Sequence, residues 1–392
     1  MVRRPAAVAG RVVLAALLLA ARLAAQEPPA VQVSTGFGVD TARASNREIF
    51  ALFQRYLTHR LDTIRPNPDW SSSEQRRWPV FDLLSGYVYQ GFPHVTVVQL
   101  APAVGLDSTY LIRVLISAVD DSTRDVRPLA LYRVYAVRES GRWVLANALP
   151  RMTRDWQRET IGSVTFFYPS THSFERTRAR ATARFVDSLS RRLDVPVPKT
   201  DYYFTDDLIE TFRALGLEYF PIGSDTVGGR SNTADRQVYV GSSSAGETYR
   251  HELAHVVLQP LITRYHPPGV VMEGLMTWTG GSAGLSFSEL LPGLAGYLAL
   301  HPEVTLDTVL THPPAREGSL DVGYDGAAAL CAMVLEKGGN TAVLELLGAG
   351  PSPAATLARA ARILNVPPAG LDSLWRGWIQ IQNEHRTSRN RP

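Results

Sequence analysis

Cysteine is nearly absent from this chain of 392 residues, because Cys331 is the only one. A single thiol cannot form an intrachain disulfide, so the chain is not a disulfide-stapled secreted domain. Cys331 lies in an apolar helical pattern and is expected to be a small core residue. Internal repeats and long low-complexity segments are also lacking. With 45% hydrophobic and 20% charged residues, the chain is globular and long enough for two domains.

Long apolar runs are scarce too, and the one candidate, residues 12–21, is too short for an ordinary membrane span. Arg3 and Arg4 precede this run, and Ala24 and Ala25 follow it. The pattern predicts a signal peptide at residues 1–25 and an exported protein, periplasmic or secreted, of a bacterial envelope. Cleavage would leave no stable membrane span, whereas an uncleaved segment would act as an anchor.

Neither sign of charge is in excess beyond the leader. The leader holds four arginines and no acidic residue, so the rest of the chain has 36 basic and 37 acidic residues and a formal net charge of −1. The net charge of +3 of the whole chain therefore comes from the leader. No nucleic-acid partner is expected.

One five-residue stretch carries the clearest chemical signal. His251 and His255 are four apart, and Glu252 stands beside the first. Positions i and i+4 share a helix face, so both imidazoles can reach one metal ion. Glu252 projects about 100° round the helix, where it can contact a water next to that ion. Imidazole suits zinc, so we expect one Zn²⁺ per chain; the alternative is a surface helix that happens to carry two histidines.

A third ligand is expected downstream, because a catalytic zinc commonly takes three protein ligands. Glu273 is the one carboxylate in the otherwise apolar segment 270–278. A buried carboxylate is costly unless it is paired or bound to a metal. His251, His255 and Glu273 then form a two-histidine, one-glutamate set; the alternative for Glu273 is an exposed acid at a helix start.

The sequence predicts an α+β fold in two parts. Residues 26–157 read as an accessory domain with a helix at 46–65 and an antiparallel meander, somewhat like the nuclear-transport-factor-like cone. Its strands are expected at 95–100, 110–119, 129–138 and 143–146, the last two joined by a Ser140-Gly141 turn. His59 and His94 are isolated and are expected to be structural or solvated.

Residues 158–392 read as a second domain with a small mixed sheet and a mainly helical C-terminal lobe. Strands are expected at 164–168, 201–204 and 237–241, and helices at 174–193, near 207–215 and over most of 270–382. The strand at 237–240 could pair with an extended substrate backbone, or it could be an ordinary strand at the edge of the sheet.

The second domain resembles the gluzincin metallopeptidases, a group that includes thermolysin. The resemblance covers roughly residues 161–381 and rests on His251-Glu252-x-x-His255 followed, after 17 residues, by Glu273-Gly274. Trp278, five positions after Glu273, makes the aminopeptidase-N-like branch the most similar in motif. The resemblance implies a thermolysin-like domain and a zinc metallopeptidase in which Glu252 is the general base.

A tyrosine-plus-glycine element of that branch is similar to Gly323-Tyr324-Asp325-Gly326, although the interval here is one residue shorter. The resemblance implies that the Tyr324 hydroxyl stabilises the tetrahedral intermediate; the alternative is a core or helix-start aromatic. The branch's Gly-x-Met-Glu-Asn element, whose glutamate grips a free amino group, has no counterpart. Residues 228–241 contain no glutamate and one acid, Asp235, which could simply cap a turn. Aminopeptidase specificity is therefore not expected.

The sequence thus predicts an exported zinc metallopeptidase that hydrolyses peptide or protein substrates. One alternative is a zinc-containing binding protein with a peptidase-like fold, although a purely structural zinc needs no general base such as Glu252. Another is a zinc hydrolase of other amides or esters, which motif spacing does not separate from a peptidase. His266, His301 and Thr277 could reach the site, but loop histidines are mostly solvated and Thr277 is simply explained as a helix residue.

Overall fold

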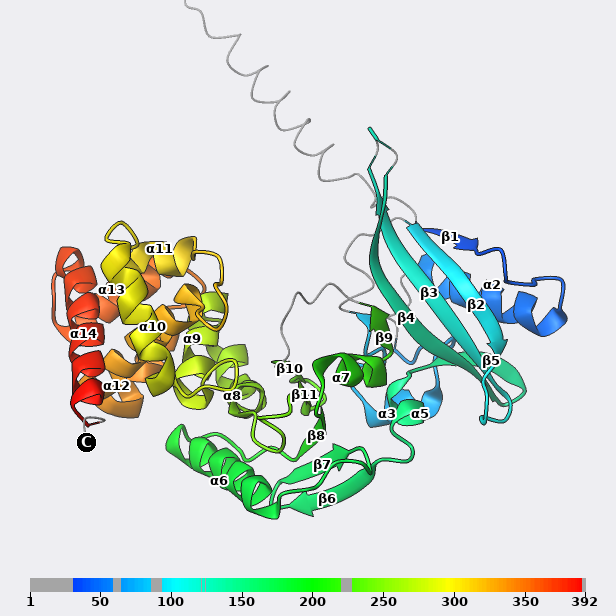
Figure 1. The fold of residues 1–392 in the computed structure, drawn as a ribbon, viewed down its shortest axis with the longest axis horizontal. Coiled ribbons are helices and arrows are strands. Elements are labelled where there is room, and N and C mark those ends of the chain that lie inside the picture. The colour runs from blue at the N-terminus through cyan, green and yellow to red at the C-terminus, as the bar shows by residue number, and fades with distance from the viewer. Residues whose placement is uncertain are drawn as a thin grey trace, which may run out of the picture. The chain divides into compact units, whose positions relative to one another are not determined.

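The structure, a computed structural model, describes residues 31–58, 65–85, 94–120, 122–123, 125–219 and 228–389. They divide into two compact units, which are described separately (Figure 1). The first takes in the described residues up to Arg151 and a short segment that begins at Leu215. The predicted signal peptide and His59 lie outside the described residues. No helix in the described ranges is long and apolar enough to cross a membrane.

The first unit is built on a sheet of six described strands with the order β1-β2-β3-β4-β5, in which β9 also pairs with β4. β1 runs parallel to β2, and the other pairs are antiparallel. The sheet is therefore mixed rather than purely antiparallel. Its strands are β1 (Gln32–Thr35), β2 (His94–Pro102), β3 (Thr109–Val119), β4 (Val126–Glu139), β5 (Arg142–Ala146) and β9 (Leu217–Tyr219).

The expected meander is present in this sheet. Ser140 and Gly141 join β4 to β5 with φ of 50° and 80°, the positive values that a tight hairpin turn requires. The helix α2 (Ala44–Thr58) is amphipathic, and its own residues Ile49, Phe53 and Tyr56 are buried. The short helices α3 (Ser72–Arg77) and α5 (Leu149–Met152) complete the described helices before the second unit.

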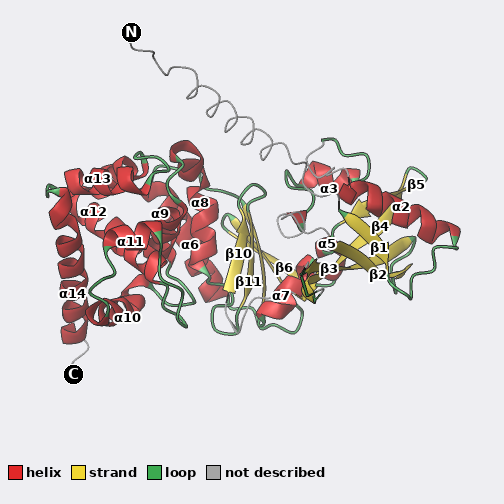
Figure 2. Cartoon of the chain, turned by 90° about the horizontal axis from the view of Figure 1, so that it is seen from above, coloured by secondary structure: helices red, strands yellow, loops and turns green. Residues whose placement is uncertain are grey.

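The second unit begins with a five-stranded sheet of order β10-β11-β8-β7-β6. The central pairs β11·β8 and β8·β7 are parallel, and the outer pairs are antiparallel. Alternate side chains, among them Phe166, Tyr202 and Val240, enter a core shared with α6 (Arg176–Arg192). Figure 2 shows α6 beside the strands of this sheet. The strands are β6 (Gln157–Ile161), β7 (Val164–Tyr168), β8 (Thr200–Thr205), β10 (Gly228–Asn232) and β11 (Gln237–Gly241), and α7 (Leu208–Leu215) follows β8.

Both alternatives given for the strand at 237–240 are wrong. This strand, β11, has β10 on one side and β8 on the other, so it is not at the edge of the sheet and neither of its sides is open to a substrate backbone. The described edge strand on this side of the sheet is β10 instead, which the sequence did not predict. Its residues are only partly buried and show no alternation, and antiparallel pairing with β11, the next strand in the chain, makes it a strand.

The rest of the second unit is helical, as expected. The helix α12 contains a kink, because Gly338 and Gly339 leave helical φ and ψ. Cys331 on α12 is buried, and burial raises the pKa of its thiol to about 12, in keeping with its expected place in the core. The helices are α8 (Arg250–Tyr265), α9 (Gly269–Gly280), α10 (Phe287–Leu300), α11 (Leu306–Thr311), α12 (Val322–Leu347), α13 (Pro353–Leu364) and α14 (Leu371–Arg389).

Candidate metal centre

Two consecutive helices, α8 and α9, bring the candidate ligands together. His251 and Glu252 lie in the first turn of α8, and His255 lies one turn further on the same face. His266 ends α8 in the left-handed region, with φ of 48°, and Pro267-Pro268 follow it. The chain then turns into α9, which carries Glu273 back to the two histidines.

The three side chains converge on one point. The Nε2 atoms of His251 and His255 lie 3.2 and 3.4 Å from the same carboxylate atom, Glu273 Oε2. One ligand atom from each residue lies within 4.8 Å of the other two. Two imidazole nitrogens and a carboxylate oxygen are a donor set that zinc accepts, and a tetrahedral ion would keep a fourth position open. The residues present therefore fit a catalytic zinc.

Close helix packing sets this convergence. A Cβ added at Gly274 would lie 2.4 Å from Ala327 Cβ, so α9 packs tightly against α12 next to Glu273. A Cβ at Gly280 would lie 2.6 Å from the backbone nitrogen of His251. His251 Nδ1 donates a hydrogen bond to Gly281 O at 2.7 Å, which orients the ring.

The cluster is electrostatically coupled. Burial alone would raise the pKa of Glu273, but hydrogen bonds from His251 and His255 lower it to about 2. Burial lowers the pKa of His251, but Glu273 and the charge of Glu252 outweigh burial, so the net shift is upward. Glu273 is therefore an anion at neutral pH, which is the form that binds a cation.

The ligands open into a cleft of about 430 Å³ in the second unit. Glu252 and Tyr324 both line it, and Glu252 is only 9% exposed. The Tyr324 ring lies nearly parallel to the His251 ring, with centroids 6.3 Å apart. Burial, followed by the charge of Glu273, raises the pKa of Tyr324 to about 12, so the hydroxyl keeps its proton at neutral pH. The cleft thus holds a carboxylate and a phenolic donor beside the ligand cluster.

The outermost described strand, β10, forms part of the cleft wall. A Cβ at Gly229 would lie 2.8 Å from Glu252 Cγ, so the backbone of β10 passes directly against the candidate base. This contact was not predicted from the sequence. The Gly228-Gly229 pair was the available signal, because glycine in a strand often marks a close approach.

The other residues considered from the sequence lie away from the cleft lining. Asp235 closes the β10–β11 turn, where its Oδ2 accepts a hydrogen bond from Asn232 Nδ2 at 2.6 Å. His266 ends α8, and His301 Nδ1 lies 3.0 Å from Glu303 Oε1. Thr277 is fully buried, and its hydroxyl has no hydrogen-bond partner among the described residues. His94 lies on β2 in the first unit.

One buried acid next to Tyr324 was not predicted. Asp325 is fully buried, and its Oδ1 has no hydrogen-bond partner within the described ranges. Burial raises the pKa of this carboxyl to about 7. The only signal in the sequence was an acid inside the apolar start of α12, where it could equally have been an exposed helix-start residue.

No family model matches the chain, and no curated protein matches it. Among solved structures, it is similar to an M1 zinc metallopeptidase from Deinococcus radiodurans, with 15% identity and a TM-score of 0.31 over 73% of this chain and 63% of that one. A point mutant of that enzyme gives 12% identity and a TM-score of 0.32, over 73% and 62%.

The chain thus covers less than two thirds of the length of either structure. A TM-score near 0.3 does not establish a shared fold. The function proposed below therefore rests on the geometry of the His251, His255 and Glu273 cluster.

Proposed function

We propose that this protein is a zinc-dependent metallopeptidase of the gluzincin type. One observation carries the proposal: His251 Nε2, His255 Nε2 and a Glu273 carboxylate oxygen converge within 4.8 Å, in the same cleft as Glu252 and Tyr324. A site for metal storage or structure would need the three ligands alone. An additional buried carboxylate beside an open cleft is what hydrolysis requires.

His251, His255 and Glu273 would hold the zinc. When bound, zinc supplies Lewis acidity, which polarises a substrate carbonyl and lowers the pKa of a water molecule. Gly281 O holds the His251 ring through Nδ1, which leaves Nε2 directed at the ligand point.

Glu252 acts as the general base. Its carboxylate lies on the ligand helix but round from His251, so it faces the cleft without joining the ligand cluster. In that place it accepts a proton from the attacking water and later delivers it to the leaving amine. The wall of β10 at Gly229 restricts its movement.

Tyr324 acts as a hydrogen-bond donor. Its hydroxyl stays protonated well above neutral pH, because its pKa is raised to about 12. A protonated phenol in the cleft can donate to the oxygen that becomes negative when the carbonyl is attacked. A donor of this kind contributes a few kcal/mol to the transition state.

The substrate is proposed to be a peptide or protein outside the cytoplasm, since the leader predicts export. The first unit is proposed to be an accessory domain that recognises or presents this substrate. A zinc-containing binding protein and a hydrolase of other amides or esters are the competing functions. The position of Glu252 in the cleft wall favours hydrolysis over binding alone.

Metal analysis followed by cleavage of a peptide library, with and without a chelator, tests the proposal. The expected result is one zinc per chain and cleavage that the chelator abolishes and added zinc restores. One bound zinc without chelator-sensitive cleavage of peptides, amides or esters would support the binding-protein alternative.

The variant Glu252→Gln tests the role of Glu252 as the general base. This variant keeps the shape and the three ligands, so zinc content should be unchanged. Turnover should fall roughly 10²–10⁴-fold, because the amide cannot accept the proton. Near-normal turnover would rule out the general-base mechanism.

A further inference from the structure

The helix that carries both histidines begins without a capping side chain. Tyr249 occupies the N-cap position of α8, and its side chain makes no cap hydrogen bond. The first turn of a helix has backbone N–H groups without intrahelical partners, and without a cap it frays easily. In α8 this turn contains His251 and Glu252. Their positions therefore depend on contacts made by the preceding loop, residues 242–248.

A buried tyrosine on β8 fixes the end of this loop. The Tyr202 hydroxyl donates to Gly246 O at 2.8 Å and accepts from the backbone nitrogen of Tyr249 at 3.0 Å. Tyr202 is fully buried, so its ring is held by the core. One hydroxyl thus bridges the loop and the N-cap residue of α8. From α6, Thr182 Oγ1 donates to Glu247 O at 2.6 Å.

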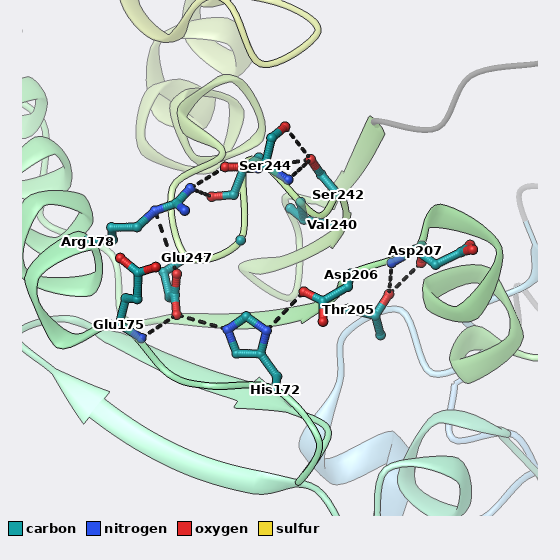
Figure 3. A network of polar contacts seen from close by, with 12 residues as sticks. His172, Glu175, Arg178, Thr205, Asp206, Asp207, Val240, Ser242, Ser244 and Glu247 are labelled. Carbon is teal, nitrogen blue, oxygen red and sulfur yellow. Dashed lines mark hydrogen bonds and ion pairs between the residues drawn. The ribbon is translucent and has the colours of Figure 1, made fainter.

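A buried carboxylate holds the same loop from the other side. Glu247 is 1% exposed, and its Oε1 accepts from the backbone nitrogen of Glu175 at 2.7 Å (Figure 3). His172 Nε2 lies 3.1 Å from the same atom, and His172 Nδ1 lies 2.9 Å from Asp206 Oδ1. Arg178 Nε lies 3.8 Å from Glu247 Oε2. Arg178 also donates to Ser244 O at 2.5 Å, within the loop itself.

Three residues, Tyr202, Glu247 and His172, are thus central to the contacts that hold this loop. A buried carboxylate is costly unless it is hydrogen-bonded or paired with a charge. Here a backbone N–H and an imidazole form hydrogen bonds to Glu247, and the Arg178 guanidinium forms a longer ion pair with it. Glu247 does not line the cleft, so it has no direct part in the chemistry. It stands four residues before His251, in the loop that leads into the uncapped first turn.

We propose that Tyr202, Glu247 and His172 are positioning residues of the metal centre. They hold the loop at 242–248. Through this loop they keep His251 and Glu252, in the first turn of α8, correctly placed relative to His255 and Glu273. The inference rests on the proposed zinc function, but its first measurement is zinc affinity, which does not require peptidase activity.

Tyr202→Phe is the sharpest variant, because it removes one hydroxyl and keeps the ring in the core. Zinc affinity, measured by competition with a chelator, should fall roughly 10–100-fold, as is typical when the support of a ligand is lost. The kcat should fall with it, while KM changes little, because the cleft residues that would contact the substrate remain. Zinc-saturating conditions should restore only part of kcat, since Glu252 is also displaced.

Tyr56→Phe is the matched control. It also removes the hydroxyl of a buried tyrosine, one that donates to Asp82 Oδ2 at 2.8 Å in the first unit. It should lower the melting temperature but leave zinc affinity and kcat unchanged. If both variants alter zinc affinity equally, the loss is general destabilisation and the positioning role is wrong.

Glu247→Gln and His172→Gln give a second test if Tyr202→Phe does not fold. Glu247→Gln keeps an acceptor for the Glu175 N–H, so it should retain more zinc affinity than Glu247→Ala. His172→Gln removes the link to Asp206 and should weaken zinc binding at least several-fold. Wild-type zinc affinity in all folded variants overturns the inference, whereas failure of the unaltered protein to bind zinc overturns the proposed function instead.

Discussion

Tyr324 combines a ring that lies parallel to a ligand ring with a hydroxyl in the cleft. Tyr324→Phe keeps the ring and removes the donor. The kcat should fall roughly 10²–10³-fold, the size found when one oxyanion donor is lost, with zinc content unchanged. Steady-state kinetics with metal analysis checks this. An unchanged kcat would mean that Tyr324 is a helix-start aromatic with a packing role only.

Asp325 makes the stability of the second unit depend on pH. Its pKa is raised by burial to about 7 in the folded protein, while an unfolded aspartate titrates near 3.8. Between these values the unfolded chain has released the proton and the folded chain still holds it. Stability therefore falls as pH rises from about 4 to about 7, by on the order of 4 kcal/mol in total.

Asp325→Asn should remove this dependence, because the amide has the same shape and does not ionise. The melting temperature of the variant should exceed that of the parent by a margin that grows from pH 4 to pH 7 and is constant above pH 7. Thermal unfolding in the presence of a chelator measures this without a contribution from metal binding. A margin that does not change with pH would contradict the buried, shifted carboxyl.

Among the elements, β10 has a steric requirement that bears directly on Glu252. A side chain at Gly229 would meet Glu252 Cγ at 2.8 Å and Tyr239 O at 3.1 Å, and the carbonyl is part of the sheet backbone. Gly229→Ala should therefore displace Glu252 and lower kcat at least tenfold, with zinc affinity nearly unchanged because the ligands lie further from β10.

Gly296→Ala serves as the control for this substitution. Gly296 lies inside α10, and an added Cβ would have no heavy atom within 4 Å. Alanine favours a helix over glycine by up to about 1 kcal/mol, so this variant should be slightly more stable and fully active. Equal activity of the two variants would show that β10 does not constrain the base.

Some features of the helices and strands can be predicted from local sequence, and others cannot. Residues four apart on a helix share a face in any fold, so His251 and His255 could be paired from spacing alone. The strand β9 depends on pairing with the distant strand β4, whereas β10 pairs with β11, the next strand in the chain. The residues of β9 and β10 show no clear alternating pattern. Because β10 has no strand pattern of its own, the sequence predicted β11 but not that β10 pairs with it.

Asp325 and the loop before α8 illustrate the same limit for side chains. Whether an acid at a helix start is buried depends on which helices pack over it. The partners of the Glu247 carboxylate are two hydrogen-bonding groups, from His172 and Glu175, and the Arg178 guanidinium, all about 70 residues earlier in the chain. No local pattern marks such partners, whereas the candidate metal ligands His251 and His255 follow a short and recognisable motif.

At the scale of the whole molecule, the charges of the cleft bear on substrate choice. Among the described lining residues, the carboxylates are Glu252 and Glu273, and both have proposed roles in the metal site. Among the described lining residues, therefore, no further carboxylate remains to bind the free amino group of a peptide. A charged hydrogen bond of that kind is worth about 1.5–3 kcal/mol, or roughly 10–100-fold in kcat/KM.

Peptides with acetylated amino termini should thus be cleaved about as well as the same peptides with free amino termini. Paired substrates that differ only in the acetyl group, compared by kcat/KM, provide the measurement. A preference of more than roughly tenfold for the free terminus would indicate aminopeptidase specificity, contrary to this expectation.

The shared carboxylate oxygen of Glu273 has a further consequence. The hydrogen bonds that draw both imidazoles to this atom need hydrogen on the same Nε2 atoms that would bind zinc. Metal uptake is therefore an exchange in which protons leave as the ion enters. Acidification would empty such a site, so metal supply and ambient acidity would together determine how much of the protein holds a metal ion.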